Sequence, residues 1–144
     1  MNNLKKEIER PEIFNAIRKS IPDARYSARK LAEAFTENIK PLRMEESEHM
    51  FVNLSQNIQE LDYFLDFITQ LREGMRYFDG FSLPADPISS EGAGLSLFQE
   101  MHAALESKDW IMLSDLIEYE LSPLLLKQEQ WLGSLNEKIL EYDA

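Results

Sequence analysis

The sequence predicts an all-α protein, an up-and-down bundle of four to five helices. Apolar residues recur three and four positions apart over most of the chain, which is the repeat of an amphipathic helix. No segment alternates apolar with polar residues as a half-buried strand would. With 144 residues, of which 44% are hydrophobic, the chain has the size and composition of one globular domain. We therefore expect residues 1–144 to form a single helical-bundle domain.

Two predicted helices follow a short leading segment. Residues 1–10 carry Leu4 and Ile8 four positions apart and form either a short helix or a mobile arm. Pro11 suits the first position of a helix, because it has no N–H that would need a partner there. Ser20 opens a capping box, Ser-x-x-Asp, so we predict that a second helix begins there. The apolar stripe of this second helix consists of Ala24, Ala28, Leu31, Phe35 and Ile39.

The most regular apolar pattern predicts one long central helix over about residues 42–78. No proline or glycine interrupts the chain between Pro41 and Gly74. Six apolar residues alternate steps of three and four, as one face of a helix requires: Phe51, Leu54, Ile58, Leu61, Leu65 and Ile68. A flank seven residues apart consists of Phe64, Leu71 and Phe78. We interpret these residues as core.

Residues 79–95 form the predicted long internal loop. This stretch holds three of the five glycines and two of the six prolines, and a loop of such length is uncommon inside a compact domain. We expect it to be the most mobile internal region, with Phe81, Leu83 and Ile88 as the side chains that pin it to the bundle.

A short helix is predicted between this loop and the last helix. Ser96 begins a second capping box, Ser-x-x-Gln, which predicts a helix from Ser96 to about Glu106. Ser107, Lys108 and Asp109 then make a tight connection that contains a second cap.

The last helix is predicted to run over about residues 109–142 and to be kinked at Pro123. Its apolar stripe keeps the same phase on both sides of Pro123, which favours one continuous helix. The alternative is that Ser122 caps a new helix with Pro123 at its first position. The stripe consists of Leu113, Ile117, Leu121, Leu124, Gln128, Trp131, Leu135, Ile139 and Tyr142.

Two apolar runs on this helix are too wide for a single core-facing stripe. Successive helical residues lie about 100° apart, so residues 110–113 cover about 300° and residues 124–126 about 200° of the helix circumference. A bundle stripe needs little more than about 100°. Some of these side chains must face away from the core, either beneath the long loop or toward another chain. The candidate interface residues are Trp110, Ile111, Met112, Leu113, Leu124, Leu125 and Leu126.

Composition narrows the classes of function. The chain has 15 basic and 26 acidic residues and a net charge of −11, so we expect no nucleic-acid partner. A basic cluster in residues 18–30 is interpreted as a helix face that pairs with Glu33, Glu37 or later acidic helices. The absence of cysteine excludes disulfides and thiolate chemistry. No apolar run is long enough for a membrane span, and the charged N-terminal residues lack a signal-peptide core, so we expect a cytoplasmic protein.

One motif has a known chemical use. Glu46-x-x-His49 is half of the pattern by which some helical bundles hold two iron ions. The other histidine, His102, has Gln99 three positions before it, so the second half is missing. We assign no catalytic, cofactor-binding or metal-binding residue and infer no small-molecule ligand.

The expected function is that of a non-enzymatic protein–protein interaction module. Such a module would act as an adaptor or chaperone-like protein, and self-association into a homodimer is one form of this hypothesis. The alternative is a helical-bundle metal-binding protein or enzyme with a carboxylate–histidine site. Metal content and the effect of His49→Ala would discriminate the two.

Overall fold

The computed structural model describes residues 2–44, 48–76, 85–89 and 92–143. The regular structure in these ranges is entirely helical, which confirms the predicted all-α class. Its elements are α1 (Asn2–Glu37), α2 (Ile39–Arg43), α3 (Glu48–Met75), α4 (Ala93–Ser107), α5 (Trp110–Leu116), a π-helical turn η2 (Ile117–Leu121) and α6 (Ser122–Asp143). No helix in these ranges is long and apolar enough to cross a membrane.

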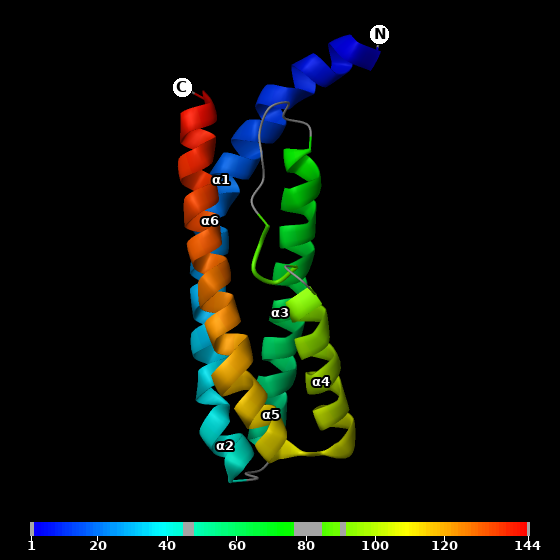
Figure 1. The fold of residues 1–144 in the computed structure, drawn as a ribbon, viewed down its shortest axis with the longest axis vertical. Coiled ribbons are helices and arrows are strands. Elements are labelled where there is room, and N and C mark those ends of the chain that lie inside the picture. The colour runs from blue at the N-terminus through cyan, green and yellow to red at the C-terminus, as the bar shows by residue number, and fades with distance from the viewer. Residues whose placement is uncertain (1, 45–47, 77–84, 90–91, 144) are drawn as a thin grey trace.

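The helices run up and down beside one another. α1 and α6 form the most extensive pair, and α3 packs against α1 in the opposite direction. α4 then descends to the end of the molecule at which α2 and α5 meet, and the first turns of α1 extend beyond the other helices (Figure 1). The core runs along the middle of the bundle.

The predicted break at Ser20 is wrong, because α1 is one helix that passes through both Pro11 and Pro22. The hydroxyl of Ser20 donates to the carbonyl of Ile17 (2.7 Å) and caps nothing. A proline inside a helix costs about 3 kcal/mol, but the buried stripe keeps one phase across Pro22. Burial of that stripe outweighs the proline and joins both predicted helices. The stripe consists of Phe14, Ile17, Ile21, Ala24, Ala28, Leu31 and Phe35.

The central helix is shorter than predicted. α3 begins at Glu48, because Leu42 and Arg43 belong to the separate short helix α2. Leu42 is fully buried there, which fixes α2 against the core. The residues of the predicted stripe and flank that are buried are Leu54, Leu61, Phe64, Ile68 and Leu71. Ile58 and Leu65 are half-buried and Phe51 is exposed, while Phe78 lies outside the described residues.

α4 begins three residues before the predicted cap at Ser96. Gly92 precedes the helix in the left-handed region (φ 72°), a conformation that suits glycine. The Gly94 N–H donates to the Ile88 carbonyl (2.8 Å), and a Cβ on Gly94 would lie 2.5 Å from that oxygen. This close approach determines where α4 starts, and Ser96 lies inside the helix.

Of the predicted loop over residues 79–95, the structure describes 85–89 and 92–95, and Phe81 and Leu83 lie outside the described residues. Ile88 is buried, as predicted. Its N–H donates to the side-chain oxygen of Gln128 on α6 (3.3 Å). Asp86, which is also buried, accepts from the Ser89 N–H (3.0 Å) and pairs with Arg72 on α3 (3.5 Å). Residues 86–89 are therefore a turn packed between α3 and α6.

The predicted continuity through Pro123 is confirmed, and the alternative of a new helix at Ser122 is wrong. α5, η2 and α6 follow without a break, and the Ser122 N–H bonds to the Ile117 carbonyl five residues earlier. This widened turn lies directly before the proline, which has no N–H of its own. It also shifts the stripe, so that Leu125 is buried where Leu124 was expected.

Candidate protein-interaction site

Exposed apolar side chains gather at one end of the bundle. Among the described residues, eleven large hydrophobic side chains are exposed, and five of them lie where α2 ends and where α3 and α5 begin. Exposed apolar side chains that gather in one region are typical of interaction sites. We name this feature the end surface. It consists of Met44, Phe51, Val52, Ile111 and Met112, together with the half-buried Trp110.

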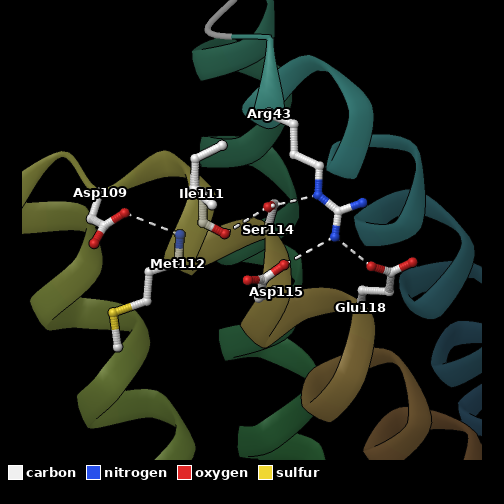
Figure 2. A network of polar contacts seen from close by, with 7 residues as sticks. All are labelled: Arg43, Asp109, Ile111, Met112, Ser114, Asp115 and Glu118. Carbon is white, nitrogen blue, oxygen red and sulfur yellow. Dashed lines mark hydrogen bonds and ion pairs between the residues drawn. The ribbon is translucent and has the colours of Figure 1, made fainter.

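Arg43 holds α2 against α5 and η2 beside this surface (Figure 2). Its Nε donates to the Ser114 hydroxyl (3.2 Å), and its Nη2 donates to Asp115 (3.0 Å) and to Glu118. Hydrogen bonds to Glu118 and then Asp115 raise the pKa of the Arg43 guanidinium above its already high ordinary value. The Asp115 and Glu118 carboxylates are thus used to hold two helices together, and Arg43 stays charged at neutral pH.

Two further contacts position the first turn of α5. Lys108 adopts a left-handed conformation (φ 56°), and the Asp109 side chain accepts from the Met112 N–H (3.1 Å), which confirms the predicted cap. The rings of Phe51 and Trp110 are 4.9 Å apart between centroids and tilted by 59°, a separation within the range of favourable aromatic pairs. The first turns of α3 and α5 are therefore joined directly.

The structure divides the seven candidate interface residues into three groups. Leu113 and Leu125 are fully buried in the core of their own chain. Trp110 and Leu124 are half-buried against that core. The exposed residues are Ile111 (50%), Met112 (41%) and Leu126 (46%).

The exposed candidates do not all share one surface. Ile111 and Met112 belong to the end surface and extend to different sides of the first turn of α5 (Figure 2). Leu126 lies instead on α6, beside a shallow hollow against α1 that includes Ala32 and Thr36. Whether any of these residues contacts another chain stays a prediction.

Sequence reasoning missed Met44, Phe51 and Val52. Phe51 fitted the core stripe of the central helix by its spacing. Met50, Phe51 and Val52 are three successive apolar residues, which cover about 200° of a helix. This run therefore exceeds one core-facing stripe in the same way as residues 110–113, and its width is the signal of an exposed apolar side chain.

The remaining sequence motifs occupy exposed positions. His49 is exposed, and Glu46 lies outside the described residues. His102 pairs with Glu106 on the surface of α4 (3.0 Å). Within the ranges that the structure describes, no three His, Asp or Glu side chains are placed to hold a metal ion.

The basic cluster of α1 pairs as interpreted from the sequence. Arg25 and Arg29 both donate to the same oxygen of Glu129 on α6 (3.0 and 3.1 Å). Lys30 pairs with Glu33 one turn along α1 (3.2 Å), and hydrogen bonding to Glu33 raises the pKa of Lys30.

The fold and this surface define a small all-α bundle with an apolar end. Residues 27–130 match a family described as Domain of unknown function (DUF8042), and because the match covers more than half of the chain, the protein belongs to that family. The matched range includes every residue of the end surface. No curated protein and no solved structure matches the chain.

Proposed function

We propose that the protein is a non-enzymatic protein-interaction module, adaptor or chaperone-like, that binds a partner protein through the end surface. The supporting observation is that five of the eleven exposed large hydrophobic side chains lie at this one end. Phenylalanine, tryptophan and methionine are enriched in the cores of protein interfaces.

The contacts that position the helices of the end surface favour binding without rearrangement. Arg43 joins α2 to α5, Asp109 caps α5, and the Phe51–Trp110 contact joins α5 to α3. An interface held in place before binding loses less conformational entropy when the partner arrives. Residues 41–144 carry six basic and twenty acidic residues, so the electrostatic attraction favours a basic partner over an acidic one.

Photocrosslinking at two positions tests this proposal. A photoreactive amino acid at Val52, which is exposed on the end surface, should give discrete crosslinked products in cells, and Ile111→Glu should remove them. The control is the same amino acid at Tyr119, an exposed position outside the end surface. Equal products at both positions, or products at Val52 that survive Ile111→Glu, would contradict the proposal.

Sedimentation velocity identifies self-association. If the partner is a second copy, the purified protein sediments as a dimer, and Ile111→Glu converts it to a monomer of unchanged helicity. Leu140→Glu, which changes an exposed residue near the end of α6, is the matched control. Stoichiometric metal in the purified protein that is lost in His49→Ala would replace the proposal with the metal-binding alternative.

A further inference from the structure

A groove of about 450 Å³ runs between the middle of α1 and the middle of α3, and it shares no residue with the end surface. Its buried lining is apolar and consists of Ala24, Leu31 and Phe64. Tyr26 and Tyr63 rise at its edges with 62% and 65% of their surface exposed. Sites that bind through apolar contact have this form, with an apolar lining and a few polar groups around it.

The groove exists because the two helices contribute side chains of unequal size. α1 presents the short side chains of Ser20, Ala24 and Ser27 along one face, at helical spacing. α3 presents the aromatic rings of Phe64 and Phe67 opposite them. Phe67 remains only half-buried. A third helix that carried large side chains would therefore find space above the short residues of α1.

The charges around the groove are mainly negative. Asp23 on α1 and Glu60 on α3 belong to opposite walls, and neither forms an ion pair with another described residue. The one basic side chain of the lining, Lys30, pairs with Glu33 (3.2 Å) and lies 5.5 Å from the ring centroid of Tyr26. Two carboxylates thus remain available on the rim, beside aromatic faces that also attract cations.

We propose that this groove binds a basic amphipathic helix from a partner protein. The apolar face of that helix packs on Phe64 and Phe67, and its lysine or arginine side chains reach Asp23 and Glu60. This is the helix-in-groove mode of recognition. The two rim carboxylates favour a basic partner, and the net charge of −11 repels a second copy of the chain. The site is separate from the end surface and does not depend on the function proposed there.

Fluorescence anisotropy with a synthetic peptide tests the groove. The probe is a labelled leucine–lysine peptide of about four helical turns, with leucines at the spacing of one helix face. Replacing both rim carboxylates in Asp23→Asn/Glu60→Gln should weaken binding about tenfold and reduce its dependence on salt. Ser27→Trp, at an exposed position of the lining, should block binding by filling the groove.

Three controls make the test specific. Asp62→Asn/Asp66→Asn removes the same charge from exposed positions of α3 outside the lining and should leave affinity unchanged. A leucine–glutamate peptide should not bind. Ile111→Glu should bind the lysine peptide as the unaltered protein does. Loss of binding in this variant would place the peptide at the end surface and contradict binding in the groove.

Two other results would also overturn the proposal. Equal weakening by both double variants would mean that binding follows net charge alone. A dimer of the purified protein that Ser27→Trp dissociates would mean that the groove holds a second copy. Circular dichroism of each variant confirms that the helices remain folded.

Discussion

Glu129 and Gln128 are buried polar side chains on α6, and they differ in how many of their polar atoms have a hydrogen-bond partner. The Glu129 carboxylate accepts hydrogen bonds from Arg25 and Arg29, which lie on successive turns of α1. Two positive charges therefore face its negative charge. Gln128 accepts from the Ile88 N–H, while its Nε2 has no hydrogen-bond partner among the described residues. Both side chains join distant parts of the chain, α1 to α6 and the turn at residues 86–89 to α6.

Glu129→Gln should lower the free energy of unfolding by about 1–2 kcal/mol. The variant loses the charge that faces two arginines, but both guanidinium groups are about half exposed and remain hydrated, so the cost stays below that of a fully buried pair. Urea denaturation measures the change. Glu106→Gln, which alters an ion pair on the surface of α4, should have no measurable effect. Equal effects in the two variants would show that the Glu129 contacts add nothing to stability.

At the scale of elements, α3 and the last helix show how packing modifies an amphipathic pattern. Leu61 and Leu65 hold equivalent positions in the stripe, yet Leu61 is buried and Leu65 is only half-buried. The buried face of α3 includes Phe64, Leu71 and Met75. α1 packs against α3, and the groove opens between these two helices beside Phe64.

Leu61→Ala should therefore cost more than Leu65→Ala. A buried leucine shortened to alanine costs about 2–5 kcal/mol through lost burial and the cavity left behind. Leu65→Ala removes a side chain that is already partly in water, and we expect less than about 2 kcal/mol there. Thermal and urea unfolding of both variants measure the difference. Equal losses would mean that the exposure of Leu65 does not persist in solution.

The two helix-interior prolines give a paired prediction. Pro22 lies inside the continuous helix α1, whereas Pro123 follows the widened turn η2. Both side chains are exposed, so replacement by alanine removes little packing. Pro22→Ala should stabilise the protein by about 1–3 kcal/mol, because it restores a helical N–H and relieves crowding. Pro123→Ala should change stability by less than about 1 kcal/mol, because η2 already accommodates the ring. A larger gain at Pro123 would contradict this role for η2.

At the scale of the whole molecule, charge opposes the packing of the bundle. The net charge of −11 comes from the later part of the chain, since residues 1–40 carry nine basic and six acidic residues. Cross-helix pairs such as Arg25–Glu129 and Arg43–Asp115 place basic residues of the first part against acidic residues of the second. These pairs offset only part of the repulsion, because acidic residues outnumber basic ones.

Salt should consequently stabilise the protein at neutral pH. Shortening the Debye length from about 30 Å to about 8 Å screens repulsion between the surplus carboxylates, and we expect Tm to rise by a few degrees. Differential scanning calorimetry over a sodium chloride series measures the effect. A sucrose series of equal osmolality is the control for effects unrelated to charge. A fall in Tm with salt would mean that the ion pairs outweigh the repulsion.

Properties that depend on neighbouring residues could be predicted from the sequence alone. The all-α class, the Asp109 cap and the continuity of the last helix all follow from local spacing and local hydrogen bonds. Capping signals at Ser20 and Ser96 failed because a cap contributes only about 1 kcal/mol. Burial of a long stripe on α1 and the contact between Gly94 and Ile88 outweighed them.

Which apolar residues remain exposed depends on how the helices pack together. Leu113 is buried and Ile111 is exposed within one run of four apolar residues, and Leu125 and Leu126 differ in the same way. A sequence shows that such a run exceeds one helix face, but the neighbours that cover each side come from distant segments. The end surface and the groove between α1 and α3 both result from that arrangement, since exposure is a property of what packs against a helix rather than of the helix itself.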